Sequence, residues 1–322
     1  MAGPPRSGGP GPAQRPVAAS LVDTVLFVAH QGPALLERGS APYLYLPKLE
    51  HHAEATWWDD LLGRLESLLG LPRHTIRLSV LVETAPAAYQ LEEIVHALRH
   101  RVTALTAGRY DYVASHLHLY AARPDHVLPD REALTMSTRF LRTYAEVIVH
   151  TAHRRGVQAI GGPVAQVPCG LADDATHRAL ARVRADKTRE AGQSFDGGWV
   201  LHPALVPVTR QAFEQALGHP ARPGPRRPAS SSAPDWRLLG DVADLKATPT
   251  LDGLRTTVRS CLRYLTGWLS GQGTCEIEGH LEDLGTVELA RLQGWQWTHH
   301  RGGTGRGALG DLGADRTDHG RG

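Results

Sequence analysis

Apolar residues occur in short runs and at helical spacing through the middle of this 322-residue chain. Short apolar runs bounded by turn residues predict strands, and apolar residues three or four positions apart predict helices. The helix expected at about 134–155 has two arginines in its final turn, and Gly156 follows it, which is the usual stop signal. Candidate strands lie at 21–29, 43–47, 75–83, 110–115, 157–161 and 198–202, and candidate helices at about 54–69, 91–98, 134–155 and 173–192.

This alternation of strands and helices predicts parallel strands joined by crossover helices. Two architectures have that pattern, an open doubly wound sheet and a (β/α)8 barrel of the TIM type. No Gly-x-Gly-x-x-Gly follows the first candidate strand, so a dinucleotide-binding fold loses support. Six candidate strands are two short of a complete barrel.

Segments rich in proline and glycine divide the chain into units. Residues 1–17 predict a disordered leader, 218–236 a linker and 299–322 a loose tail rich in glycine and arginine. The barrel-like pattern therefore occupies 18–217. Residues 237–298 contain one strongly amphipathic helix over 254–269 and a second over about 284–297, with no evident strand pair. We expect a helical C-terminal domain there.

Composition narrows the function classes. The net charge is +2, and Lys and Arg do not cluster on an aromatic-rich stretch, so nucleic acid is not an expected partner. No apolar run is expected to reach the length of a membrane span. Three widely spaced cysteines give neither a disulfide framework nor a zinc site, which favours a reducing compartment, and the cytoplasm is the expected location.

Two acidic residues lie at the ends of neighbouring apolar runs, in the pattern of a catalytic site. Glu83 closes the run at 75–82, and Asp111 stands at the head of the next. Carboxylates at the carboxyl ends of strands are where α/β enzymes keep their chemistry, and two of them can bind a hard divalent cation such as Mg2+. Taken alone, both residues are also compatible with solvated loops.

A set of short strings strengthens the first interpretation, because they occur together and in a fixed order. The strings are Tyr-Leu-Tyr-Leu-Pro-Lys-Leu-Glu at 43–50, Val-Glu-Thr at 82–84, Gly-Arg-Tyr-Asp-Tyr at 108–112, the Gly-Gly pair ending at 162, Val-Arg-Ala-Asp-Lys at 183–187, Phe-Asp-Gly-Gly-Trp-Val at 195–200, Gly-Leu-Arg-Thr at 253–256 and Leu-Glu-Asp at 281–283. In these strings the chain resembles the A-type malate synthase family, in one register from about residue 18 to residue 297.

The resemblance implies a (β/α)8 barrel with a C-terminal helical plug. It also implies the reaction of the glyoxylate cycle that condenses glyoxylate with acetyl-CoA and water to give malate and CoA. The implied cofactor is Mg2+, and the implied partners are those two substrates. By resemblance the metal ligands are Glu83 and Asp111, the glyoxylate site is formed by Gly108, Arg109, Tyr110, Asp111 and Trp199, and the base that takes the methyl proton of acetyl-CoA is Asp283.

Asp283 also has a simple structural interpretation. It stands directly before a predicted helix, where an aspartate commonly serves as the N-cap, and both roles are compatible. Two other groups suggest structure rather than chemistry. His153 is expected to cap a helix or fill the core, and Arg184 and Lys187 are expected on a solvated helix face.

The chain departs from the family at its start and beside the expected base. The family's catalytic arginine lies on an early barrel strand, upstream of the segment that 18–29 matches, where this chain has proline and glycine. We therefore expect a barrel incomplete at its N-terminal strands, and activity impaired by the loss of one oxyanion donor. Leu284 is bulkier than the alanine that the family has beside the base.

Three functional hypotheses remain open on these grounds. The first is a malate synthase-like acyltransferase. The second is a non-catalytic remnant that binds Mg2+ and glyoxylate, and the third is another Mg2+-dependent enzyme acting on acyl-CoA, such as a lyase. The sequence leaves the oligomeric state open.

Overall fold

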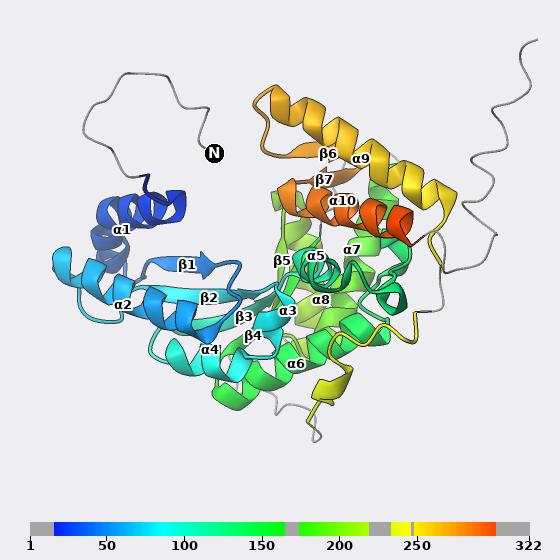
Figure 1. The fold of residues 1–322 in the computed structure, drawn as a ribbon. Coiled ribbons are helices and arrows are strands. Elements are labelled where there is room, and N and C mark those ends of the chain that lie inside the picture. The colour runs from blue at the N-terminus through cyan, green and yellow to red at the C-terminus, as the bar shows by residue number, and fades with distance from the viewer. Residues whose placement is uncertain (1–15, 165–173, 219–232, 246–247, 301–322) are drawn as a thin grey trace, which may run out of the picture.

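A curled sheet of five parallel strands forms the centre of the structure, a computed structural model that describes residues 16–164, 174–218, 233–245 and 248–300 (Figure 1). The strands lie side by side in chain order, so each crossover leads to the neighbouring strand as in a barrel. The expected α/β class and incomplete barrel are therefore confirmed. The strands are β1 (Tyr43–Leu46), β2 (Arg77–Val82), β3 (Val102–Ala107), β4 (Gln158–Val164) and β5 (Gly197–Val200).

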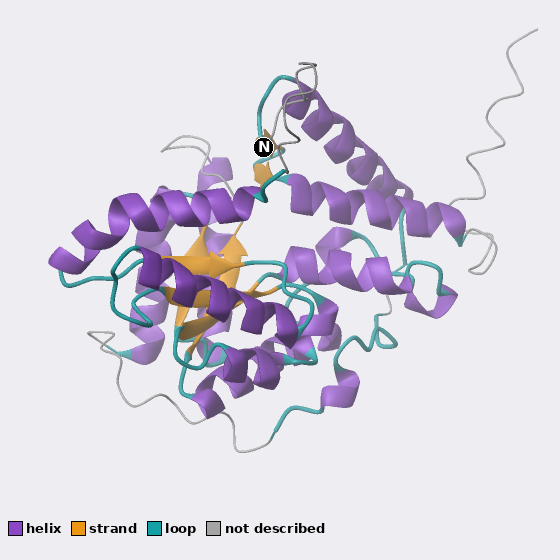
Figure 2. Ribbon diagram, turned by 60° about the vertical axis from the view of Figure 1, so that its left-hand side comes forward, coloured by secondary structure: helices purple, strands orange, loops and turns teal. Residues whose placement is uncertain are grey.

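Helices cover the outer face of this sheet, as Figure 2 shows for the strands and the helices around them. Apolar side chains of the strands, such as Val80 and Leu105, are fully buried together with Phe140 and Ile148 of a crossover helix. The helices of this part are α1 (Ala19–Glu37), α2 (His52–Leu68), α3 (Ala85–Ala88), α4 (Leu91–Ala97), α5 (Arg109–Tyr120), α6 (Arg139–Arg155), α7 (Asp174–Gly192) and α8 (Val206–Leu217).

The local signals explain where these helices begin and end. The His51 side chain accepts a hydrogen bond from the Ala53 N–H and completes a capping box with Glu54 at the start of α2. Gly156 has φ 76° and ends α6 in the left-handed region, as the sequence predicted. His153 lies near that end with its side chain buried against Asp196, at 3.0 Å, which confirms its structural role.

Two strand predictions are wrong. Residues 21–29 lie within helix α1, and residues 110–115 lie within helix α5, whose preceding strand is β3. Short apolar runs are ambiguous between strand and buried helix, and tertiary packing decides between them. The second error concerns Asp111, which was expected at the head of a strand. It lies instead in the first turn of α5, where it follows the carboxyl end of the parallel strand β3.

Helix α1 is also the one described helix that meets the length and composition of a membrane span, contrary to expectation. A single helix of this kind is weak support for a membrane. Val22, Val25, Leu26 and Phe27 are exposed on it.

The C-terminal unit packs against α5 and contains a short hairpin between two helices. Helices α9 (Leu251–Leu269) and α10 (Leu284–His299) flank the antiparallel strands β6 (Cys275–Ile277) and β7 (His280–Glu282). The unit is mainly helical, as expected, but it also contains a strand pair where none was evident from the sequence. Glu278 and Gly279 both have positive φ at the hairpin turn, and a glutamate there is not one of the residues that signal such a turn in a sequence.

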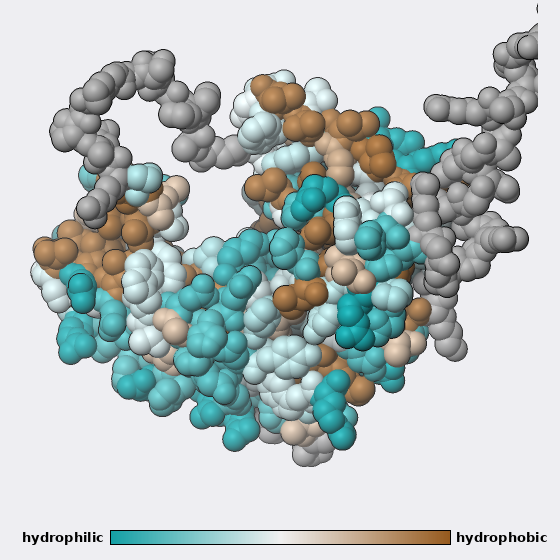
Figure 3. All heavy atoms as spheres, viewed as in Figure 1, coloured by the Kyte–Doolittle hydropathy of each residue, from teal (hydrophilic) through white to brown (hydrophobic). Residues whose placement is uncertain are grey.

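Exposed apolar side chains run along one side of α9 and give the brown surface over this helix in Figure 3. They recur at helical spacing, so they lie on one face of the helix. Patches of this kind are typical of protein–protein contacts. The residues are Val258, Leu262, Leu265 and Leu269.

Several expectations concern residues that the structure describes only in part. Most of the expected leader, linker and tail lies outside the described residues, as does Cys169. Cys261 and Cys275 are both free. The unit boundaries, the reducing compartment and the cytoplasmic location stay predictions.

A buried ion pair joins α2 to the start of β3. Arg101 is 1% exposed and donates two hydrogen bonds to the fully buried carboxylate of Glu66, at 2.6 and 2.9 Å. Its Nε also donates to Asp59 at 2.6 Å. Burial alone would raise the pKa of Glu66, but the hydrogen bonds from Arg101 and from the Ile76 and His74 N–H groups outweigh it and lower that pKa.

We expect Arg101→Met to lower the free energy of unfolding by about 3–5 kcal/mol, because the Glu66 charge would remain buried without its partner. Urea unfolding followed by circular dichroism measures this change. The control is Arg99→Met, since Arg99 is exposed and bonds only the His96 carbonyl oxygen among the contacts described, and it should shift stability by less than about 0.5 kcal/mol. Equal effects of the two substitutions would contradict the role of the buried pair.

Candidate functional site

One pocket of about 610 Å3 opens at the carboxyl ends of the strands, between the sheet and the C-terminal unit. Loops after β1, β2 and β3 form one wall, and the start of α10 forms the opposite wall. Every residue that the sequence singled out for chemistry lines this pocket, namely Glu83, Gly108, Arg109, Tyr110, Asp111, Trp199 and Asp283.

The carboxylates of Glu83 and Asp111 meet around a shared lysine. The Lys48 N–H donates to Glu83 Oε1 at 2.8 Å. The Lys48 ammonium donates to Asp111 Oδ1 and lies 3.4 Å from Glu83 Oε2. Burial and the nearby charge of Asp111 raise the pKa of Glu83, although Lys48 opposes this shift. A single ammonium therefore contacts both carboxylates of the pair.

These residues fit a divalent cation. Both ligands present hard oxygen donors, and a positive charge, the Lys48 ammonium, already lies against both. Among the described residues no group of three or more His, Cys, Asp and Glu side chains forms a metal cluster. A cation here would take its remaining ligands from water or substrate, as Mg2+ commonly does.

The two carboxylates come together because the ends of β2 and β3 approach closely at Gly108. A Cβ on this residue would lie 2.8 Å from Glu83 Cβ, too close for any side chain. The Gly108 N–H donates to the hydroxyl of Tyr144 at 2.8 Å, and that hydroxyl donates in turn to the Val82 carbonyl oxygen. The buried Tyr144 therefore ties the ends of both strands to α6.

Arg109 and Tyr110 form a fixed pair at the start of α5. The Arg109 guanidinium lies 4.6 Å from the centre of the Tyr110 ring and donates to its hydroxyl at 2.8 Å. The N–H groups of this first helical turn have no carbonyl partner within the helix, so they are available to an anion.

The far wall contains Trp199, which stacks on Tyr45 with ring centres 5.2 Å apart. Tyr45 belongs to β1 and Trp199 to β5, so the stack joins the first and last strands across the inside of the curled sheet.

A buried ion pair between Lys187 and Glu190 contradicts one prediction. Lys187 was expected on a solvated face but is fully buried, and it donates to Glu190 at 2.9 Å and to the Gly162 carbonyl oxygen at 2.6 Å. Burial raises the pKa of Glu190 to about 7, against the opposing charge of Lys187. A side chain at Gly161 would displace the Glu190 carboxylate from this position, since a Cβ there would lie 2.0 Å from it.

Asp283 enters the pocket from the C-terminal unit as the N-cap of α10. Its Oδ1 accepts from the Thr286 N–H at 2.9 Å, and the Thr286 hydroxyl accepts from the Asp283 N–H at 3.0 Å. The capping interpretation is therefore confirmed, and Asp283 also lines the pocket. The turn packs closely against the carboxylate of Asp111 at Gly285. A Cβ on this glycine would lie 2.7 Å from Asp111 Oδ1.

Sequence reasoning missed the residues that hold this turn in place. The buried Glu282 accepts two hydrogen bonds from Arg131, at 3.0 and 2.8 Å. Three side chains of α10 fix the helix to main-chain carbonyl oxygens of the loop after α5. Gln293 donates to Pro129 at 2.8 Å, Gln296 to His126 at 2.9 Å, and Trp297 to Leu128 at 2.7 Å. The sequence offered one signal for these residues, namely that Glu282 directly precedes Asp283.

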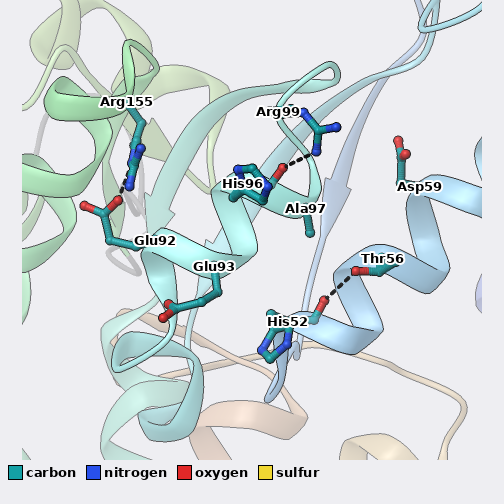
Figure 4. Close-up of a pocket in the computed structure, with 9 residues that line it drawn as sticks. All are labelled: His52, Thr56, Asp59, Glu92, Glu93, His96, Ala97, Arg99 and Arg155. Atoms are coloured by element: carbon teal, nitrogen blue, oxygen red, sulfur yellow. Dashed lines mark hydrogen bonds and ion pairs between the residues drawn. The ribbon is translucent and has the colours of Figure 1, made fainter.

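A second hollow, of about 500 Å3, lies between α2 and α4 and holds none of the residues singled out for chemistry. Figure 4 shows that its charged side chains do not converge: Glu92 turns to Arg155, and the Arg99 side chain bonds the His96 main chain. We assign it no chemistry.

Comparison with known proteins agrees with this geometry. The chain matches the family "Malate synthase, TIM barrel domain" over residues 11–230 and "Malate synthase, C-terminal" over residues 248–308. It is 44% identical over 89% of its length to a malate synthase of Streptomyces clavuligerus, and 37% identical over 88% to malate synthase A of Escherichia coli. It covers 53% of each, so the chain spans about half the length of these relatives.

One solved structure has the same fold at lower sequence identity. It is a Haloferax volcanii malate synthase described as a ternary complex with pyruvate and acetyl-CoA. The TM-score is 0.52 at 18% identity, over 83% of this chain and 66% of the other.

We expect Gly108→Ala to lower the free energy of unfolding by about 1–3 kcal/mol, because the new methyl group overlaps Glu83. Displacement of that carboxylate should also weaken Mg2+ binding by roughly 10- to 100-fold, measured by isothermal titration calorimetry. Gly192→Ala is the control, since nothing lies within 4 Å of its new methyl group. Wild-type affinity in Gly108→Ala would contradict the packing argument.

Proposed function

The chain belongs to the malate synthase family, and we propose that this pocket condenses glyoxylate with acetyl-CoA and water to give malate and CoA. One observation supports the proposal most: Glu83, Asp111 and Asp283 come from distant parts of the chain, and their side chains line the same pocket. The family membership favours this reaction over the alternative acyl-CoA lyase.

We assign Mg2+ to Glu83 and Asp111. The bound ion would act as a Lewis acid toward the glyoxylate aldehyde. The other groups at this wall bind and orient the substrate. The free N–H groups in the first turn of α5 suit the glyoxylate carboxylate, and Trp199 with Pro163 forms an apolar wall that limits water.

Asp283 is assigned as the general base. It is exposed at the pocket, and its capping bond uses Oδ1, which leaves a second carboxylate oxygen for a proton. That oxygen would remove a proton from the acetyl methyl group, and the C–H electron pair would form the enolate. The enolate carbon would then attack the aldehyde carbon to form the new C–C bond, the electron pair of the C=O π bond would move to the aldehyde oxygen, and that oxygen would take up the proton held by Asp283. Water would cleave the C–S bond of the thioester, giving the second carboxylate of malate and free CoA.

We expect Asp283→Asn to reduce turnover by about 100- to 10,000-fold, because asparagine cannot accept the proton. Asparagine is itself a good N-cap, so the fold of α10 should be retained and Mg2+ affinity should stay unchanged. The assay follows free CoA thiol released from acetyl-CoA in the presence of glyoxylate and Mg2+. The control is Asp252→Asn, since Asp252 is 91% exposed near the start of α9 and pairs with Arg255.

Two results would contradict the proposal. Unchanged turnover in Asp283→Asn would exclude this residue as the base. A wild-type chain without turnover, but with Mg2+-dependent glyoxylate binding that Glu83→Ala abolishes, would favour the non-catalytic hypothesis instead.

A further inference from the structure

Lys48 has no role in the function proposed above, yet it makes the closest polar contacts with both assigned metal ligands. Its ammonium contacts Glu83 and Asp111, and its N–H donates to Glu83 Oε1 at 2.8 Å. A divalent cation bound by both carboxylates would repel an ammonium held this close to the same oxygens, so binding of the metal favours departure of the ammonium.

The backbone at Lys48 is in a conformation that side chains rarely adopt. Its φ is 58°, in the left-handed region, directly after Pro47. Unfavourable backbone of this kind persists where the surroundings enforce it, and it concentrates at functional sites. This backbone conformation directs the main-chain N–H of Lys48 toward Glu83 and its ammonium toward both Glu83 and Asp111.

The ammonium can leave this position without disturbing the loop. The Lys48 side chain is 59% exposed, so its stem lies along the pocket rim, whereas the N–H anchor to Glu83 involves only the backbone. Of the described residues that line the pocket, two are cationic, Lys48 and Arg109. Arg109 is held against Tyr110, so Lys48 is the movable one.

We propose that Lys48 is an exchangeable internal cation: a divalent metal displaces its ammonium from Glu83 and Asp111, and the freed ammonium then binds the anionic substrate at the pocket rim. The inference rests on the proposed metal and glyoxylate site. It adds an order of events, because the substrate gains this cation only after the metal has bound.

The exchange predicts effects of opposite sign in Lys48→Gln, which removes the charge but keeps the backbone N–H. Mg2+ should bind roughly 10- to 100-fold more tightly, since a charge-assisted hydrogen bond no longer has to be broken. Glyoxylate, titrated with Mg2+ at saturation, should bind about tenfold more weakly. Isothermal titration calorimetry measures both constants on the full chain. A lysine that only held the carboxylates in place would give weaker Mg2+ binding when removed.

A chemical readout follows the displacement directly. Saturating Mg2+ should speed the labelling of the Lys48 amine by an amine-specific reagent, read by peptide mass spectrometry. Lys187 is the control within the same chain, because it is buried and bonded to Glu190, and its slow labelling should not respond to Mg2+. Arg99→Gln controls for a change in overall charge and should leave both affinities unchanged.

The possible outcomes separate this inference from the function on which it rests. Equal or weaker Mg2+ binding in Lys48→Gln, with normal binding in the wild type, would overturn the exchange and leave the metal site intact. Unchanged glyoxylate affinity would overturn the second role of Lys48. If neither protein bound Mg2+, the metal site itself would be wrong, and the exchange with it.

Discussion

The parallel pairing of β2 with β3 is the constraint on which the site depends. Parallel strands end at the same edge of a sheet, so the residues that follow them are brought together whatever their separation in sequence. Here the approach is so close that position 108 admits no side chain, and the Tyr144 hydroxyl bridges the two strand ends. Two carboxylates are held near each other despite their repulsion, and burial together with the nearby charge of Asp111 raises the pKa of Glu83.

The opposite wall depends on a different kind of contact. The C-terminal unit is joined to the barrel part by the ion pair between Arg131 and the buried Glu282 and by hydrogen bonds from α10. Such bonds are directional, so they fix how far α10 stands from the sheet as well as its orientation. Asp283 inherits its position from this docking, because it directly follows Glu282 and caps the docked helix.

The sequence predicted the composition of the site better than its local structure. Asp111 was assigned to the head of a strand, whereas it lies in the first turn of α5, where it follows the carboxyl end of β3 and comes beside Glu83. Asp283 was predicted as both cap and pocket residue, and it is found in both positions. The roles of these residues in catalysis stay predictions.

Other features had no local signal. The contact of Lys48 with Asp111 joins residues far apart in the chain, and its positive φ is set by the packed loop rather than by the residue type. The run at 21–29 became a helix, since apolar runs of this length do not distinguish a strand from a helix. Likewise, Lys187 is buried because Gly161 of β4 and Gly198 of β5 leave space for the Lys187–Glu190 pair. The spacing of apolar residues along helix α7 gives no sign of that space.

The way in which α10 recognises its loop has a consequence for sequence change. Gln293, Gln296 and Trp297 all bond carbonyl oxygens, which every amino acid carries, so these bonds do not depend on which side chains the loop presents. Exposed loop positions are therefore free to vary over evolution as long as the path of the main chain is kept. An insertion or deletion in this loop, by contrast, would shift all three acceptors at once and move Asp283 away from the opposite wall of the pocket.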